Sequence, residues 1–217
     1  MPLFQEIGVI GLGMIGGSVA LDVRKAGVAK RIIAASRRRS TLEKAKRAGL
    51  IDQAVCNSKS IFEKADFVVL ATPPSVVSHY LEIMAKTNPS LLVTDVSSVK
   101  GKIVQAANKI LGRKHSFVGS HPIAGSEQSG LEAAQPNLFQ GKTVVVTPAR
   151  KNQEESVRKV VAFWSCLGAR VKLLGPNEHD YLLAATSHLP HLIVYALLDT
   201  AMKVKSPLFQ SCAGTGF

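Results

Sequence analysis

The sequence is poor in cysteine. Its 217 residues include three cysteines, Cys56, Cys166 and Cys212. They are odd in number and widely spaced, which fits neither a disulfide framework nor the short spacing of a metal site. Disulfide-free chains are typical of reducing compartments. We therefore expect a protein of the reducing cytosol that holds no metal ion.

Targeting and membrane signals are also lacking. The first residues, Met1 to Glu6, lead directly into an apolar strand pattern, without the charged segment and apolar core of a signal peptide. No apolar stretch approaches the ~20 residues that span a bilayer. The sequence therefore predicts a soluble, cytoplasmic protein with no membrane partner.

Acidic residues are scarce beside basic ones. The chain has 27 Lys and Arg against 15 Asp and Glu, a net charge of +12, and much of the excess lies between Arg24 and Arg47. Such a balance favours anionic partners, and a phosphate-rich cofactor with a carboxylate substrate would satisfy it. Nucleic acid is the competing interpretation, but the aromatic stacking residues of single-strand binders are not interleaved with these charges. We expect no nucleic-acid partner.

Apolar runs of strand length alternate with helical patterns through most of the chain. The predicted strands cover residues 7–10, 32–35, 67–71, 91–95, 117–119, 143–147 and 169–174. A helix is expected over 41–48, with Ser40 or Thr41 as its cap and Gly49 as its stop. This alternation predicts an α/β fold, a Rossmann-type, mostly parallel sheet with helices on both faces.

The pattern changes at Gly175-Pro176-Asn177. From Glu178 onward it is long and helical, and Pro190 inside it should bend or locally open the helix. We therefore predict a dinucleotide-binding domain over residues 1–175 and the beginning of an all-helical domain over residues 176–217.

A glycine motif follows the first predicted strand. Gly11, Gly13 and Gly16 have the spacing of the dinucleotide fingerprint, and a helical pattern comes directly after them. The first glycine permits a tight turn, the second lets the backbone approach a pyrophosphate, and the third lets the helix pack close to the strand. The N-terminus of that helix, at Met14 and Ile15, offers N–H groups to the phosphates. A structural glycine turn is the ordinary alternative.

The end of the second predicted strand indicates which dinucleotide binds. An NAD enzyme usually has a carboxylate there, whereas this chain has Ser36, Arg37 and Arg38. Guanidinium groups bind phosphate oxygens, so NADP is the predicted cofactor and NAD the less favoured one. A solvated basic turn is the alternative. The strand over 67–71 ends at Thr72 and Pro73, whose loop backbone could lie against the cofactor.

Histidines supply the candidate catalytic groups. His121 follows the apolar run 117–119, where ligands of a parallel sheet collect, although a turn or anchor histidine is the ordinary alternative. His188 and His191 are three residues apart and share a helix face. Without a third ligand a metal site is disfavoured, so the pair is either packed or faces substrate.

Four segments together resemble the prephenate and arogenate dehydrogenases of tyrosine biosynthesis. In chain order they are residues 11–18 (GLGMIGGS), 95–100 (DVSSVK), 121–130 (HPIAGSEQSG) and 187–191 (SHLPH). The histidine and serine segments make the resemblance specific. Arg37 and Arg38 make the chain look most like the NADP-using arogenate dehydrogenases. The resemblance implies a dinucleotide-binding domain followed by a helical dimerisation domain, and hence a homodimer of the full-length protein.

The resemblance also implies an oxidative decarboxylation and roles for particular residues. His121 would accept the proton or hydrogen bond of the ring hydroxyl of prephenate or arogenate. Ser98 would lie near that hydroxyl and the cofactor, with capping of a helix near Val99 as its ordinary alternative. Glu127 would lie at the pocket mouth, or be a plain surface carboxylate. Lys100 would support cofactor or substrate charge, or be solvated.

The chain departs from the family pattern at its end. Family members continue past a Gly-Phe like Gly216-Phe217 into a segment with a substrate-binding arginine and further dimerisation helices. We expect a fragment on this ground. The alternative to an active dehydrogenase is then a catalytically silent NADP-binding module. Whether the substrate is arogenate or prephenate, and whether tyrosine inhibits, stay open.

Overall fold

The computed structural model describes residues 1–87, 90–112, 115–149, 154–205 and 209. The chain divides into two compact units, Met1–His179 and Asp180–Phe217. Among the described residues, the strands lie in the first unit and the second unit is helical. The domain boundary predicted after residue 175 is close to this division. Cys212 and the Gly216-Phe217 pair lie outside the described residues.

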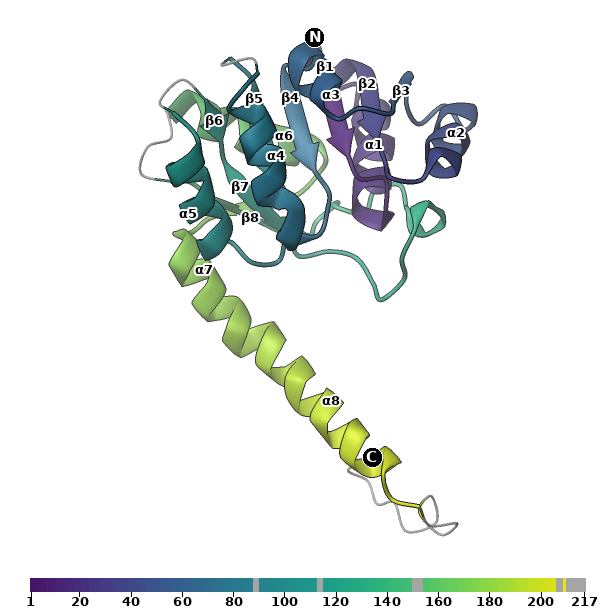
Figure 1. Ribbon diagram of the computed structural model, residues 1–217, viewed down its shortest axis with the longest axis vertical. Helices are drawn as coiled ribbons and strands as arrows, with labels where there is room; N and C mark the ends of the chain where they lie inside the picture. Colours follow the sequence, from purple (N-terminus) through teal and green to yellow (C-terminus); the bar gives the residue numbers. More distant parts are fainter. Residues whose placement is uncertain (88–89, 113–114, 150–153, 206–208, 210–217) are drawn as a thin grey trace. The chain divides into compact units, whose positions relative to one another are not determined.

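A six-stranded parallel sheet forms the centre of the first unit (Figure 1). Its order is β3-β2-β1-β4-β5-β6, and every neighbouring pair is parallel. The strands are β1 (Phe4–Ile10), β2 (Ala29–Ala35), β3 (Gln53–Val55), β4 (Phe67–Leu70), β5 (Leu92–Asp95) and β6 (Ser116–Phe117). The order reverses between β1 and β4, as it does in dinucleotide-binding folds. The predicted Rossmann-type sheet is confirmed.

Helices cover both faces of this sheet. They are α1 (Met14–Ala26), α2 (Arg39–Arg47), α3 (Lys59–Lys64), α4 (Val77–Met84), α5 (Gly101–Ile110) and α6 (Glu154–Cys166). Phe67 and Val69 of β4 join a core with α1 and α6, whereas Val68 and Leu70 join another with α3, α4 and α5. Because alternate strand residues point to opposite faces, these are the two faces of one sheet.

The start of α2 differs from the prediction. The sequence predicts Ser40 or Thr41 as the cap, but the helix begins at Arg39 with Arg38 at the N-cap and no side-chain capping bond. The chain already turns at Arg38, whose carbonyl accepts from the N–H of Thr41 at 3.1 Å, so both hydroxyls fall inside the first turn. Gly49 follows the helix with φ of 70°, a left-handed conformation that suits its predicted role as the stop.

A second, three-stranded sheet contains His121. Its order is β7 (Gly119–Pro122), β8 (Thr143–Thr147) and β9 (Arg170–Leu173), with β7 antiparallel to β8 and β8 parallel to β9. The single strand predicted over 117–119 is therefore wrong, since β6 ends at Phe117 and β7 begins at Gly119. His121 therefore lies within an antiparallel strand, opposite Val145, and not at the end of the strand predicted over 117–119.

The segment after β7 is held against α1, and it includes the short 3₁₀ helix η2 (Leu131–Ala133). Ser18 Oγ accepts from the N–H of Gln135 at 2.9 Å, and Asp22 Oδ1 accepts from the N–H of Asn137 at 2.6 Å. Burial raises the pKa of Asp22, against the opposing effect of backbone hydrogen bonds from residues 137–139. A Cβ on Gly17 would lie 2.7 Å from Ala134, so this packing requires glycine there.

The second unit is helical, and α7 (Pro176–Leu183) leads into it. A π-helical turn, η3 (Ala184–His188), precedes α8 (Leu189–Met202), and Pro190 is at the start of α8. The local opening predicted for the helix near Pro190 is therefore present, because a π turn is a widened turn. Exposed apolar side chains line α8: Leu189, Leu192, Ile193, Val194, Tyr195, Leu197 and Leu198.

One helix bears on the expectation about membranes. Within the described residues, Pro176–Met202 is long and apolar enough to cross a bilayer by length and composition, with 6% of its apolar window buried. Polar residues such as His188 and His191 interrupt the apolar run, so the sequence pattern by itself does not indicate a span of that length. Length and composition alone are weak evidence for a membrane span.

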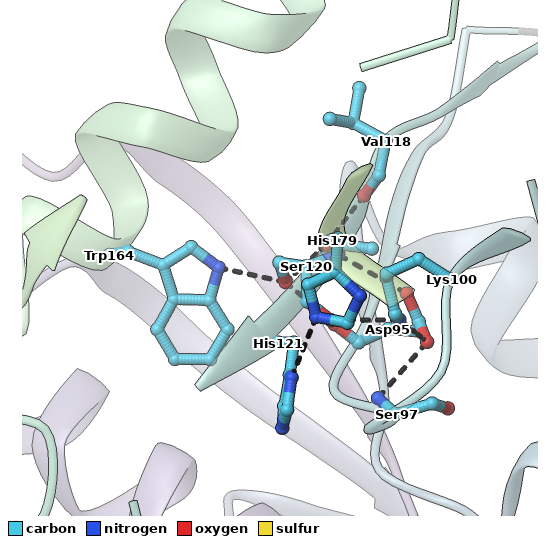
Figure 2. A network of polar contacts seen from close by, with 9 residues as sticks. Asp95, Ser97, Lys100, Val118, Ser120, His121, Trp164 and His179 are labelled. Atoms are coloured by element: carbon cyan, nitrogen blue, oxygen red, sulfur yellow. Dashed lines mark hydrogen bonds and ion pairs between the residues drawn. The ribbon is translucent and has the colours of Figure 1, made fainter. Parts of the chain in front are cut away.

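A buried ion pair ties the two sheets together (Figure 2). Lys100 Nζ donates to the carboxylate of Asp95, and both side chains are 0% exposed. Lys100 Nζ also donates to the carbonyl of Ser120 at 2.9 Å, and Asp95 Oδ1 accepts from the N–H of Ser120 at 3.2 Å. Asp95 ends β5 and Ser120 lies in β7, so the pair fixes one sheet against the other. The solvated alternative for Lys100 is wrong.

We predict that Lys100→Met lowers the free energy of unfolding by about 3–5 kcal/mol, because it leaves the Asp95 carboxylate buried without its cation. Urea unfolding followed by circular dichroism measures the loss. Lys159→Met is the matched control, since Lys159 pairs with Glu155 on the surface and should cost less than about 1 kcal/mol. Equal losses in the two variants would contradict the structural role of Lys100.

Candidate functional site

The predicted cofactor residues lie at one edge of the parallel sheet. Gly11 follows β1, Ser36 follows β2 and Thr72 comes shortly after β4. The turns after neighbouring strands are linked, since Gly11 N donates to Ala35 O at 2.8 Å and Ala71 N donates to Ile10 O at 2.8 Å. Segments far apart in sequence therefore meet at the carboxyl edge, where ligands of open α/β sheets bind.

The three fingerprint glycines have different surroundings. Gly11 has φ of 97°, and a Cβ on it would lie 2.3 Å from the carbonyl of Ala71. A Cβ on Gly16 would lie 1.9 Å from the carbonyl of Gly11, so the turn and the helix contact each other closely. A Cβ on Gly13 would meet nothing within 4 Å. Gly11 and Gly16 are thus required by close packing of the backbone, whereas Gly13 borders open space.

The N-terminus of α1 opens onto that space. Gly13 is the N-cap of α1 and makes no side-chain capping bond, and Met14 and Ile15 form the first turn. The first N–H groups of a helix have no partner within it and carry partial positive charge. These residues fit the pyrophosphate of a dinucleotide, which would approach past Gly13 and accept from those N–H groups.

The basic segment after β2 is exposed. Ser36 is half-buried, whereas Arg37 and Arg38 are exposed. Arg39, directly after them, is held by Glu43 at 3.1 Å on α2. The positions of Arg37 and Arg38 suit a ribose 2′-phosphate, and their exposure suits a solvated basic turn equally well.

Two buried hydroxyls at the same edge lack a hydrogen-bond partner among the described residues. They are Thr72 Oγ1, after β4, and Ser97 Oγ, after β5. Buried hydroxyls are usually satisfied by protein or ligand, so a bound ligand would complete both. Pro73 is exposed beside Thr72, ahead of the one-turn helix η1 (Pro74–Val76). Thr72 was predicted from sequence, whereas Ser97 was not selected.

Ser98 is not a helix cap. It is exposed in the bend after β5, and α5 begins at Gly101 with Lys100 at its N-cap and no side-chain capping bond. The capping alternative for Ser98 is wrong because Asp95 Oδ2 accepts from the N–H of Ser97 at 3.0 Å and turns the chain before the helix starts. Ser98 is thereby left at the ligand edge of the sheet, and its catalytic role stays a prediction.

His121 is a nearly buried ring, 9% exposed, with a second histidine against it. Its Nδ1 lies 2.9 Å from Nε2 of His179, and the two rings meet edge to face at 5.1 Å between centroids (Figure 2). The neighbouring Ser120 is fixed by Asp95 and Lys100, and its Oγ accepts from Nε1 of Trp164 at 3.0 Å. The backbone that carries His121 is therefore held from several sides.

The loop after His121 returns to the glycine fingerprint. Gly125 has φ of 117°, and a Cβ on it would lie 2.6 Å from Cε of Met14. Ser126 Oγ lies 3.6 Å from Sδ of the same methionine. The histidine segment and the N-terminus of α1 are thus in direct contact. Glu127 follows in the same loop and is exposed. This exposure is compatible with a residue at the pocket mouth and with a plain surface carboxylate.

His188 and His191 belong to the second unit and are exposed. His191 Nδ1 donates to the carbonyl of Ser187 at 2.7 Å, which leaves Nε2 as its deprotonated nitrogen when the ring is neutral. The substrate-binding role of both histidines stays a prediction. In the part of the chain that the structure describes, no group of three or more His, Cys, Asp or Glu side chains could hold a metal ion.

Sequence reasoning missed the residues that support His121. His179 is 58 positions away in the chain, and no motif or spacing links the two. Ser120 and Trp164 lie in a strand and a helix, and nothing in the sequence indicates the hydrogen bond between them, since they are 44 positions apart. Asp95 and Lys100 did carry a signal, because a carboxylate at a strand end five residues before a lysine can form a local pair.

The comparisons with known proteins agree in one family. The nucleotide-binding domain of prephenate dehydrogenase matches residues 19–173, and its dimerization domain matches residues 175–217. A prephenate dehydrogenase of Bacillus subtilis is 34% identical over 211 residues, which are 95% of this chain and 57% of that protein. The chain thus spans little more than half the length of this relative.

Two solved structures are similar over nearly the whole chain. The prephenate dehydrogenase of Aquifex aeolicus, in complex with hydroxyphenyl propionate and NAD⁺, has a TM-score of 0.88 at 34% identity, covering 94% of this chain and 71% of that one. The arogenate dehydrogenase of Synechocystis has a TM-score of 0.85 at 34% identity, covering 98% and 76%. The chain belongs to the prephenate dehydrogenase family.

Proposed function

We propose that this chain takes part in the NADP-dependent oxidative decarboxylation of prephenate or arogenate in tyrosine biosynthesis. The observation that carries the proposal is the contact of the loop after His121 with Met14 of the fingerprint. It puts the chain segment of a nearly buried imidazole against the start of the helix that fits the cofactor's pyrophosphate. A base and a hydride acceptor would therefore share one site.

The oxidative decarboxylation requires that the substrate be oriented toward the hydride acceptor and that one base accept a proton. When bound, the nicotinamide of NADP would supply the acceptor for the hydride, with its two electrons, that leaves the ring carbon bearing the hydroxyl. The ring carboxylate departs as carbon dioxide, and the electron pair of the broken bond enters the ring, which becomes aromatic. His121 would take the hydroxyl proton or its hydrogen bond as this carbon loses hydride. Ser98 would hydrogen-bond beside it, and Glu127, His188 and His191 would contact substrate.

The substrate's side chain is left as two candidates. The similar proteins include both a prephenate and an arogenate dehydrogenase, so the family alone does not choose between a keto acid and an amino acid. Steady-state assays with each substrate decide it. We further propose a cytoplasmic location, as expected for a small-molecule biosynthetic enzyme.

We expect His121→Asn to lower kcat by roughly 10²–10⁴-fold, the usual contribution of general acid–base catalysis. NADPH binding, followed by fluorescence, should be unchanged, because the phosphate-binding residues are untouched. His79→Asn is the matched control, since His79 is an exposed histidine of α4.

The same assay separates the alternatives. Unchanged turnover in His121→Asn would remove the base from the proposal. Saturable NADPH binding by the unmodified chain, with no turnover of either substrate, would instead support the catalytically silent NADP-binding module.

Cofactor choice depends on the basic segment after β2. Replacing Arg37 and Arg38 with Ala should weaken NADP binding much more than NAD binding, because only NADP carries the 2′-phosphate. Arg39→Ala is the control, as Arg39 already pairs with Glu43. The measurement is the Kd of each cofactor for each variant. Equal losses for the two cofactors would mean that Arg37 and Arg38 form only a general basic surface.

We also propose that the chain forms a homodimer through α8. This helix exposes several apolar side chains to solvent, and an apolar surface of this kind is typical of a protein–protein interface. Residues 175–217 match a domain named for dimerization. Leu192→Glu combined with Leu198→Glu should shift the mass toward the monomer in analytical ultracentrifugation. The exposed-site control Lys142→Glu should leave it unchanged. A dimer that persists in the double variant would contradict this interface.

A further inference from the structure

In the hydrogen bond between His121 and His179, one ring is the donor and the other is the acceptor. Nδ1 of His121 and Nε2 of His179 are 2.9 Å apart, and His179 is fully buried. A neutral imidazole has one N–H and one acceptor nitrogen, so one of these two rings donates and the other accepts. Which ring donates decides which nitrogen of His121 carries its proton, and so whether the other nitrogen can act as a base.

A base at position 121 requires the proton on Nδ1. If Nε2 of His121 is to take a proton from a substrate hydroxyl, Nδ1 must already be protonated and must donate to His179. Nε2 of His179 must then be its acceptor nitrogen. In the opposite arrangement His121 would carry its proton on Nε2 and could only donate to the hydroxyl. The tautomer of His179 therefore sets the tautomer of His121.

The two rings are held at this distance by their backbones. His179 is in the first turns of α7, where its N–H donates to the carbonyl of Gly175 at 2.9 Å. His121 lies in β7 beside Ser120, which is fixed by the buried Asp95–Lys100 pair. Because His179 is buried, bulk water does not replace it as the acceptor. The hydrogen bond is thus built into the fold and does not depend on a mobile side chain.

We propose that His179 is a positioning residue that holds His121 in its Nδ1–H tautomer, which makes Nε2 the proton acceptor. The proposal rests on the proposed function for the role of His121 as base, but the tautomer itself can be observed without any turnover. Once Nε2 of His121 has taken a proton, the same hydrogen bond stabilises the imidazolium, since His179 remains an acceptor.

Two substitutions at one position separate this role from packing. His179→Gln keeps an acceptor, because the amide oxygen of glutamine reaches about as far as imidazole Nε2. His179→Leu fills similar space but offers no acceptor. The first readout is the ¹⁵N spectrum of the whole chain with labelled histidine at a pH where the rings are neutral. His121 is assigned by the signal that His121→Asn loses.

The unmodified chain and His179→Gln should show His121 as the Nδ1–H tautomer, and His179→Leu should show a large Nε2–H population. In steady state, His179→Leu should lose roughly tenfold to hundredfold in kcat, part of the usual contribution of a general base, with KM and NADPH binding little changed. His179→Gln should recover much of that loss.

An Nε2–H tautomer at His121 in the unmodified chain would overturn the proposal, whether or not His179→Leu folds. Equal kcat losses in the Leu and Gln variants would also overturn it, as they would indicate a packing role. Absence of turnover together with the Nδ1–H tautomer would instead count against the proposed function and leave the positioning role supported.

Discussion

The buried pair of Lys100 and Asp95 is the interaction on which the rest of the site depends. Two fully buried charges are stable only when each has the other and further hydrogen bonds, and here Ser120 supplies both a donor and an acceptor. This arrangement joins β5 of the parallel sheet to β7 of the second sheet. Since His121 is the next residue after Ser120, the pair also places the candidate base.

A second constraint brings the base to the cofactor edge. The loop after β7 contacts Met14 and is then anchored along α1 by Ser18 and Asp22. Gly17 allows this packing because a Cβ there would collide with Ala134, and Gly125 has a φ of 117°, which residues with a side chain rarely adopt. The start of α1 therefore contacts the histidine loop and leaves open space in front of Gly13, where the proposed function would put the pyrophosphate.

Much of the fold could be predicted because its signals are local. Alternation of apolar runs and the fingerprint glycines indicated the parallel sheet and its ligand edge, and Pro190 indicated the altered helix turn. The break between β6 and β7 could not be seen, because residues 117–119 form one apolar run whose pairing partners are distant in sequence. The same reason hid His179, whose role depends on a ring 58 positions away. The solvated interpretation of Lys100 failed because its burial with Asp95 depends on the packing of β7, where the carbonyl of Ser120 also accepts from Lys100.

A crystal structure of the chain with NADP⁺ tests the central claim most directly. The account predicts the pyrophosphate in front of Gly13 at the start of α1, the 2′-phosphate beside Arg37 and Arg38, and the nicotinamide ring facing Nε2 of His121. A nicotinamide bound away from His121, with the pyrophosphate elsewhere than at Gly13, would contradict it.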